Sequence, residues 1–399
     1  PIPAQIYLDE IEEKYQEDHK EKEGICPVIG VYDDLKNQRQ CILRLPISKE
    51  GNTAIFGITG SGKNMLMTTI IYSLLKQYTA KEISLYLLDF ASETLKVFEK
   101  APQVGDVVLP GENEKVENLL KLMLGQLETR KKLFAEYGGD IERYNANAKQ
   151  TVPNIVVVIH NFEAFLENYE NKEEQIRYLT REGSKYGIYF ILTASSTLGI
   201  RSRILQNCKQ QIALQMKQEG DYSQIVGKTG GLIPSKQVGR GLVKLDQVYE
   251  FQTAMITAEK EPYTYLREFC ATLQKGTTER AKRIPVLPEV VDRTKLTEYI
   301  TPSLEKLPIG IETNSLEVYQ YPFGKNYMNM VLATDDSYIK FETELIKLYA
   351  QETEAELTVL DINKNINFHN TYCNIEQCSG IIDMLFDETA RRHNQKKEA

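Results

Sequence analysis

The sequence lacks any apolar run of the roughly 18 residues that a helix needs to cross a bilayer. Its longest apolar runs, such as residues 155–159 and 189–192, have the length of buried strands. No signal peptide follows Pro1, so we expect an internal piece of a longer protein. A membrane anchor of that longer protein would lie upstream.

Basic residues are not in excess, because 48 Lys and Arg stand against 56 Asp and Glu, a formal net charge of −8. A protein whose main task is to hold a nucleic acid backbone usually carries basic patches. The six cysteines form no CxxC pair and have no histidine at zinc spacing. We therefore predict a reduced cytosolic compartment, no metal-binding cluster and no nucleic acid partner.

A length of 399 residues predicts two or more domains. From residue 52 onward, short apolar runs alternate with segments of helical spacing. The predicted strands are 54–56, 83–88, 155–159 and 188–193, and the predicted helices are 65–75, 112–137, 172–186 and 262–273. This alternation is typical of an α/β fold with a mostly parallel sheet flanked by helices. Ahead of it we predict an acidic helix over 8–22 and two β-like runs at 27–32 and 40–45.

The pattern begins again after a basic, proline-bearing stretch that follows Lys275. Residues 307–311 resemble 26–31, residues 327–349 resemble 52–74, and residues 357–361 resemble 85–89. The order is kept and the offset is nearly constant, which indicates an internal repeat; chance similarity of buried strands is the alternative. We predict one module at 1–284 and a partial, degenerate second copy at 285–399.

A nucleotide-binding loop follows the first strand of the module. It fits the pattern G-x-x-x-x-G-K-[S/T] except at its last position, and a strand precedes it and a helix follows it. Glycines let backbone amides surround phosphates, and the lysine neutralises phosphate oxygens. The predicted nucleotide-binding residues are Gly57, Ile58, Thr59, Gly60, Ser61, Gly62, Lys63 and Asn64.

The residues that would hold magnesium depart from the usual pattern. Asn64 stands where a hydroxyl normally binds Mg²⁺, so magnesium binding is weakened without being ruled out. After strand 155–159, where a carboxylate is expected, the sequence reads His160 and Asn161. Glu163 is a weak candidate for the missing acid, although a surface residue at a helix start is the favoured interpretation. We predict phosphate binding with impaired hydrolysis.

Other polar residues at strand ends are weaker candidates. Asp89 either faces the nucleotide or caps the following turn, and Thr193 and Ser195 either sense the γ-phosphate or cap locally. Ring-shaped motors often place an arginine on a late loop to reach a neighbour's nucleotide. Arg201, Arg203 and Arg240 are candidates for that role, and solvated surface arginine is the alternative for each.

Several further stretches together carry a family resemblance: LLDFA at 87–91, PQVGDVV at 102–108, LETRKKLF at 127–134, GIYFILTAS at 187–195 and GRGL at 239–242. The chain resembles the ATPase modules of the type VII (ESX) secretion motor, the EssC/EccC family of FtsK/SpoIIIE P-loop proteins. The resemblance covers about residues 1–260 well and 285–399 in outline. It implies the second module plus part of the third.

The resemblance also implies a setting and a set of partners. The ligand would be ATP, with Mg²⁺ as its companion ion, and the location would be the cytosolic side of the cell membrane. The partners would be secreted WXG-type helical-hairpin proteins and other modules of the same motor, in a hexamer. Lys63 takes the phosphate-lysine role, Asn64 the magnesium position and His160 the position of the magnesium-shell acid. In the second copy the loop at 332–339 has no glycine and Tyr338 stands at the lysine position, so we predict no nucleotide there.

The leading hypothesis is a motor fragment that binds nucleotide weakly, hydrolyses little of it, and serves in substrate recognition, assembly and regulation. The alternative from another class is an FtsK-like DNA translocase, which would need basic pore loops and a pair of catalytic acids. A structural adaptor is a third hypothesis, against which the intact loop at 57–63 argues.

Overall fold

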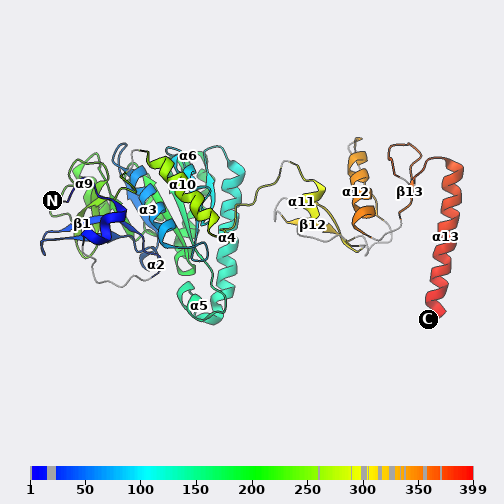
Figure 1. Ribbon diagram of the computed structural model, residues 1–399, viewed down its shortest axis with the longest axis horizontal. Helices are drawn as coiled ribbons and strands as arrows, with labels where there is room; N and C mark the ends of the chain where they lie inside the picture. Colours follow the sequence, from blue (N-terminus) through cyan, green and yellow to red (C-terminus); the bar gives the residue numbers. More distant parts are fainter. Residues whose placement is uncertain are drawn as a thin grey trace. The chain divides into compact units, whose positions relative to one another are not determined.

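The computed structural model divides the chain into two compact units, Pro1–Pro285 and Val286–Ala399 (Figure 1). It describes residues 2–15, 24–258, 261–288, 290–297, 303, 305–312, 317–322, 329–332, 334–336, 338–353, 357–368 and 371–398. Each unit is described by itself.

The first unit is built on one ten-stranded sheet in the order β2-β1-β10-β9-β8-β3-β7-β6-β4-β5. Strands β8, β3, β7, β6, β4 and β5 run parallel, and the other four add antiparallel pairs at one side. The bounds are β1 Val28–Asp34, β2 Arg39–Arg44, β3 Thr53–Phe56, β4 Ile83–Asp89, β5 Val104–Val108, β6 Asn154–His160, β7 Ile188–Ala194, β8 Gln210–Ala213, β9 Arg240–Lys244 and β10 Val248–Thr253. The predicted fold class, a mostly parallel sheet flanked by helices, is confirmed.

Two hydrophobic cores lie on the two faces of this sheet, because successive side chains of a strand point to opposite faces. In β3, Ile55 joins one core while Ala54 and Phe56 join the other. Strands β4 and β7 are buried along their whole length, which explains why they read as continuous apolar runs.

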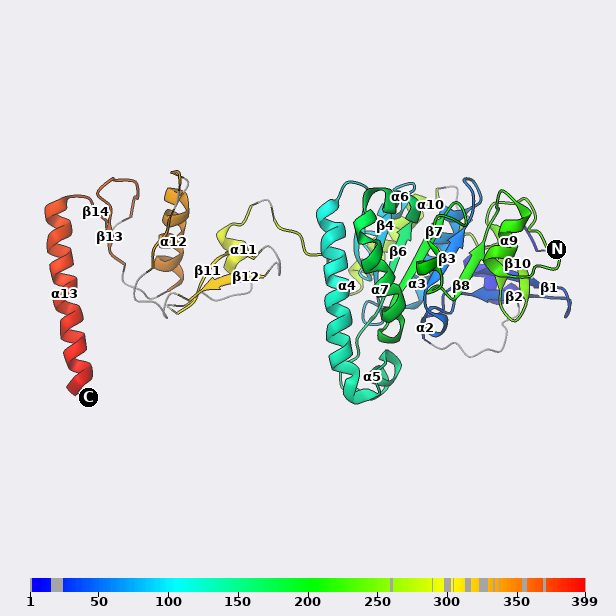
Figure 2. The ribbon, with the colours of Figure 1, turned by 180° about the vertical axis from the view of Figure 1, so that it is seen from behind.

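Helices cover both faces. Residues of α3 Lys63–Gln77 and α10 Pro262–Lys275 line the first core, and these helices lie on the face turned to the viewer in Figure 1. Residues of α4 Asn113–Phe134 and α7 Glu173–Glu182 line the second core, and α7 faces the viewer in Figure 2. The shorter helices are η1 Leu8–Glu10, α1 Ile11–Lys14, α2 Ile47–Glu50, η2 Thr94–Phe98, η3 Ala135–Tyr137, α5 Ile141–Asn147, α6 Phe162–Asn168, η4 Glu170–Lys172, η5 Gly183–Tyr186, α8 Ser202–Leu205 and α9 Glu219–Val226.

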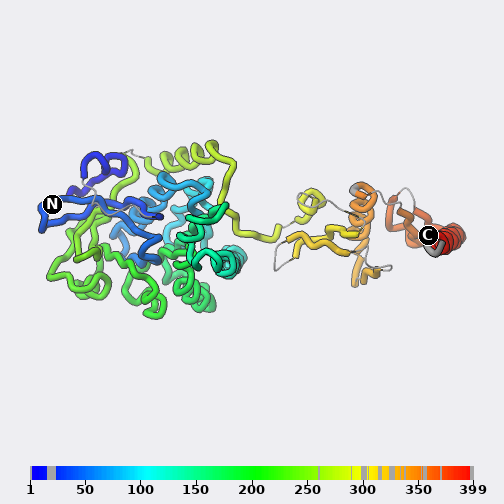
Figure 3. Tube along the Cα trace, turned by 90° about the horizontal axis from the view of Figure 1, so that it is seen from below, coloured from blue at the N-terminus to red at the C-terminus, as the bar shows by residue number. Residues whose placement is uncertain are grey.

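The predicted N-terminal helix over 8–22 is wrong within the described residues. Only η1 and α1 form, and Tyr15 already has an extended backbone; residues 16–23 lie outside the described part. Ile6 and Ile11 are buried here, and the amide of Leu8 donates to the carbonyl of Met255. Because this segment docks beside β10 at the antiparallel side of the sheet (Figure 3), tertiary contacts override the helical pattern.

The predicted helix over 172–186 is likewise divided into η4, α7 and η5. Strands β5, β8, β9 and β10 were not predicted. Strands β9 and β10 belong to the antiparallel side of the sheet, and β8 borders it. These three strands lack the continuous apolar runs of β4 and β7, so their sequences carry a weaker strand signal.

The second unit repeats features of the first in the same order. In both β1/β2 and the hairpin of β11 Leu307–Ile311 and β12 Val318–Tyr321, the pairing register shifts just before a glycine, Gly30 or Gly310. Helix α12, Tyr338–Glu352, begins at Tyr338 as α3 begins at Lys63. Its remaining elements are α11 Arg293–Thr297, β13 Val359–Leu360, β14 Thr371–Tyr372 and α13 Ile375–Glu398.

Ala333 and Ser337 of the predicted degenerate loop lie outside the described residues. Through the whole described part of the chain, no helix combines the length and the apolar character needed to span a membrane.

Candidate functional site

The candidate site lies at the carboxyl end of β3, which is held between β7 and β8. Residues 57–62 turn the chain from this strand into α3. Gly60 and Gly62 have positive φ of 82° and 100°, a conformation that glycine adopts without cost. The amide of Gly239 donates to the carbonyl of Ser61 at 2.9 Å, so the late loop before β9 packs directly on the phosphate loop.

Alanine at Gly62 is expected to destabilise the first unit more than alanine at Gly60. A Cβ built on Gly62 would lie 2.4 Å from the backbone nitrogen of Gly239, whereas one on Gly60 meets nothing within 4 Å. Both variants carry the strain of positive φ, and overpacking adds about 1–3 kcal/mol at Gly62 alone. Thermal unfolding followed by circular dichroism measures the difference. Equal melting temperatures for G62A and G60A would contradict the close packing.

The Lys63 ammonium lies inside the loop. It donates to the carbonyls of Gly57 and Ile58, the latter at 3.1 Å. Burial lowers its pKa from the ordinary value of a lysine, and the nearby Glu163 carboxylate opposes that shift. The buried hydroxyl of Ser61 has no hydrogen-bond partner within the described residues. A cation and an unpaired donor beside the amino end of α3 fit the phosphates of a nucleotide.

At the position where magnesium would bind, the side chains of Asn64 and His160 form a hydrogen bond with each other. The Asn64 Oδ1 and the His160 Nε2 are 2.7 Å apart, although the two residues are far apart in sequence. The Thr193 hydroxyl accepts from the Asn161 amide at 2.9 Å, so its own proton is available to the His160 Nδ1 at 2.8 Å. Because the Asn64 Oδ1 can only accept, the imidazole carries a proton on Nε2 and donates it to Asn64.

His160 is fully buried at the end of β6. Burial lowers its pKa from 6.5 to about 4; the Asp89 carboxylate opposes the shift and the Lys63 ammonium adds to it. The imidazole is therefore neutral near pH 7 and supplies neither a carboxylate nor a charge to a metal.

Asp89 holds the loop that completes this arrangement. Its Oδ1 accepts the amides of Ala91 and Ser92 at 3.1 and 3.2 Å, and its Oδ2 accepts the amide of Leu95 at 2.9 Å. The loop presents the Ser92 hydroxyl to the Asn64 Nδ2 at 3.0 Å. Asp89 thus caps the following turn, one of the two alternatives that the sequence left open.

Glu163 lies near Lys63 but is engaged elsewhere. Its carboxylate accepts the amides of Ser195 and Ser196 at 3.1 and 3.3 Å, and the Ser196 hydroxyl at 3.0 Å. Gly199 makes room for it, because a Cβ there would lie 2.1 Å from the carboxylate. The acid fastens the loop after β7, and its role as a replacement for the missing acid stays a prediction.

The three arginine candidates all make contacts inside the unit. Arg201 and Arg203 bind the two oxygens of the buried Glu173 carboxylate at 2.6 and 2.9 Å. Arg240 is 2% exposed and donates to the side chain of Gln252 at 2.8 Å and to the carbonyl of Ile2 at 2.9 Å. These contacts favour structural roles, and a reach to a neighbouring nucleotide stays a prediction.

Sequence reasoning missed how two distant loops contribute to the site. Ser92 and Gly239 contact it from distant loops. The stretch GRGL marked Gly239 only as part of a family resemblance, and nothing in the linear pattern points to Ser92. Asn161, which the sequence placed beside His160 where a carboxylate is expected, has φ of 67°, and its side chain caps α6 by accepting the Ala164 amide at 3.3 Å. Asparagine is among the few residues that adopt this conformation readily.

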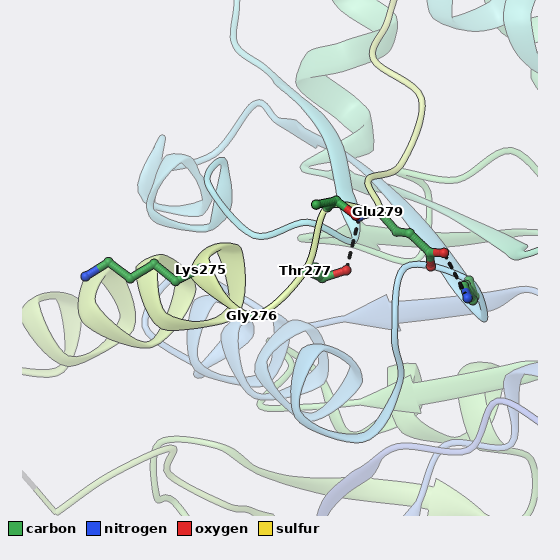
Figure 4. Close-up of a pocket in the computed structure, with 6 residues that line it drawn as sticks. Lys275, Gly276, Thr277 and Glu279 are labelled. Carbon is green, nitrogen blue, oxygen red and sulfur yellow. Dashed lines mark hydrogen bonds and ion pairs between the residues drawn. The ribbon is translucent and has the colours of Figure 1, made fainter.

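A separate open depression of about 460 Å³ lies at the end of α10 (Figure 4). Within it, Glu279 pairs with Lys81 at 2.8 Å and its amide donates to the Thr277 hydroxyl at 3.1 Å. Lys275 points away from these groups in Figure 4. The Glu279 carboxylate in the depression is already paired with Lys81, and the depression shares no residue with the loop at 57–64. We therefore assign no ligand to the depression.

The family-implied magnesium ion does not fit the residues present. Octahedral Mg²⁺ is normally held by a hydroxyl and a carboxylate at these two positions. Here an amide oxygen and a neutral imidazole replace them and bond to each other. In the described part of the chain, no three or more His, Cys, Asp or Glu side chains are grouped so as to hold a metal.

Comparison with known proteins gives related sequences of type VII secretion. ESX secretion system protein YukB of Bacillus subtilis is 26% identical over 368 residues, covering 86% of this chain and 24% of the relative. Type VII secretion system protein EssC of Staphylococcus aureus is 26% identical over 441 residues, covering 99% of this chain and 29% of the relative. The chain thus spans about a quarter of the length of these relatives.

Solved structures give the same fold. EssC (ATPases 2 and 3) from Geobacillus thermodenitrificans superposes with a TM-score of 0.84 at 22% identity, over 100% of this chain and 78% of that one. Thermomonospora curvata EccC (ATPases 2 and 3) in complex with a signal sequence peptide has a TM-score of 0.67 at 20% identity, over 96% and 75%. The resemblance to EssC/EccC proteins is confirmed.

The family profile matches the part of the chain that carries the site. The profile of the FtsK/SpoIIIE family covers residues 29–230, just over half of the chain, from β1 through the phosphate loop, Asn64 and His160 to the segment after α9. The chain belongs to the FtsK/SpoIIIE family.

Proposed function

We propose that the first unit binds ATP through residues 57–64, hydrolyses little of it, and serves a type VII secretion motor as a module for recognition, assembly and regulation. One observation carries the proposal: Lys63 is in place inside a well-formed phosphate loop while a neutral His160 stands where the magnesium-shell acid belongs. Phosphate binding needs the first feature, and hydrolysis needs what the second removes.

The impaired hydrolysis follows from the state of the nearby carboxylates. Asp89 accepts three backbone amides, and Glu163 accepts two amides and a hydroxyl. Both carboxylates are thus engaged by donors of the protein itself. A bound nucleotide therefore acts as a structural ligand, which stabilises the unit that binds it.

The partners in this proposal are inferred from the type VII secretion proteins to which the chain is related. Curated relatives are named as secretion proteins, and the EccC structure holds a signal sequence peptide. We propose that the chain handles secreted WXG-type helical-hairpin proteins, works with further modules of the same motor in a hexamer, and acts on the cytosolic side of the membrane. The second unit is, in this proposal, a partial module without nucleotide, in which Tyr338 replaces the lysine.

Calorimetric titration of ATP tests the nucleotide function. We expect wild type and Lys76→Ala to bind alike, because Lys76 lies at the far end of α3 and pairs with Asp9. Lys63→Ala is expected to weaken binding by a factor of about 10 or more, since it removes the charge-assisted contact to phosphate. Phosphate release should stay at background for all three proteins.

Two results would contradict the proposal. Absence of ATP binding to the wild type would make the loop a structural remnant. Steady ATP turnover that Lys63→Ala abolishes would show that hydrolysis is intact.

A further inference from the structure

The hydrogen bonds around Asn64 form one directed chain across four segments of the first unit. The Asn161 amide donates to Thr193, Thr193 to His160, and His160 to the Asn64 Oδ1. The Asn64 Nδ2 then donates to the Ser92 hydroxyl at 3.0 Å, and Ser92 contacts the Thr94 hydroxyl at 2.9 Å. Each group in this chain finds a partner of the right kind, so the substituted residues form a built arrangement.

This chain leaves the site without the oxygen ligands that a divalent cation needs. Asn64 could ligate a metal only through Oδ1, which already accepts the imidazole proton at 2.7 Å. The carboxylates that interact with His160 and Lys63, those of Asp89 and Glu163, hold backbone amides in place. A metal would have to break these bonds and would find no free carboxylate in exchange.

The groups that would contact phosphate are independent of a metal. The Lys63 ammonium, which lies inside the loop, and the first turn of α3 would neutralise phosphate oxygens directly. In an ordinary P-loop protein, magnesium bridges the phosphates to a hydroxyl and so adds to affinity. Here the ion would bind the same phosphate oxygens without gaining a protein ligand.

We infer that this site takes a nucleoside polyphosphate free of divalent metal, so that Mg²⁺ weakens nucleotide binding. The inference rests on the proposed function, because it concerns the same loop. Its physical basis is competition: Mg²⁺ in solution binds the nucleotide, and the complex must lose the ion or lose contacts before it can enter. Mg²⁺ is therefore expected to lower the affinity for nucleotide here, whereas it raises this affinity in a P-loop protein with intact magnesium ligands.

Titration of ATP into the full chain, once in EDTA and once in excess Mg²⁺, tests whether Mg²⁺ lowers or raises the affinity for ATP. The apparent affinity should fall by a factor of about 10 or more when Mg²⁺ is added. Equal or tighter binding with Mg²⁺ would overturn this inference while leaving the proposed nucleotide function intact. Absence of binding in both buffers would overturn both, so the two failures are distinguishable.

Two further measurements keep the inference testable. The double variant Asn64→Thr, His160→Asp restores a hydroxyl and a carboxylate, and its affinity for ATP should rise with Mg²⁺. Lys76→Ala, at the far end of α3, should keep the wild-type response to Mg²⁺. If the double variant does not fold, Mn²⁺ with ATP on the wild type replaces it, read by electron paramagnetic resonance. Free or nucleotide-bound Mn²⁺ alone supports the inference, and a protein-bound manganese signal would overturn it.

Discussion

Replacing Arg130 with Met should destabilise the first unit by about 3 kcal/mol or more. Arg130 lies on α4 and is 3% exposed. Its Nη1 donates to the carbonyls of Tyr186 and Gly187 at 2.8 and 3.3 Å, and its Nη2 donates to the carbonyl of Pro153 at 2.7 Å. The side chain thereby ties α4 to the amino ends of β6 and β7.

The size of the effect follows from the groups that are left behind. Methionine fills a similar volume but donates no hydrogen bond, so the carbonyls of Tyr186 and Pro153 lose their partner where water has little access, at about 1–3 kcal/mol for each fully buried group, whereas the Gly187 carbonyl keeps the Ile155 amide. Burial lowers the pKa of the guanidinium to about 10, which leaves it charged at neutral pH. The charged form is stabilised here by carbonyl dipoles, because no carboxylate contacts it in the described structure.

Urea unfolding followed by circular dichroism measures the loss. Lys132→Met is the matched control, because Lys132 lies on the same helix with an exposed side chain. We expect a midpoint near that of the wild type for K132M and a much lower one for R130M. Similar midpoints for the two variants would show that the carbonyls find other partners.

Arg130 also shows what a sequence pattern can and cannot reveal. The stretch LETRKKLF pointed to a family, but not to the reason for its arginine. Only the fold brings the carbonyls of Pro153 and Tyr186 to the same side chain. The strand β4 is the opposite case, because the apolar run at 83–88 identified it from the sequence alone, and the structure buries all seven residues from Ile83 to Asp89.

The phosphate loop and its metal position differ in the same way. Glycines and a lysine at fixed spacing between a strand and a helix are local features, so the loop could be predicted from the sequence. The bond between Asn64 and His160 could not, because the two residues come from different elements. The sequence showed separately that a hydroxyl is missing at Asn64 and a carboxylate at His160. The structure shows that these two residues form a hydrogen bond with each other. The prediction of an N-terminal helix over 8–22 was wrong for a related reason, because Ile6 and Ile11 are buried by tertiary contacts that the local sequence pattern does not reveal.

The stability of the first unit should decrease as the pH falls from about 6.5 toward 4, and His160 should account for about 3 kcal/mol of that decrease. Burial lowers the pKa of His160 to about 4 in the folded state, against 6.5 for an ordinary histidine. Between these values the unfolded chain binds a proton that the folded chain refuses, so protonation favours unfolding. The contribution is complete above pH 6.5 and is lost progressively below it, at about 1.4 kcal/mol for each unit of pKa difference.

His160→Gln isolates this contribution, because glutamine can donate and accept hydrogen bonds but does not titrate in this range. Carboxylates with lowered pKa, such as Asp34 and Glu112, also cost stability in acid, but they do so equally in both proteins. Urea unfolding at pH 7.5, 6 and 5 should therefore show a difference between wild type and H160Q that narrows or reverses as the pH falls. A constant difference across this range would mean that His160 titrates alike in the folded and unfolded states, and the lowering of its pKa by burial would have to be abandoned.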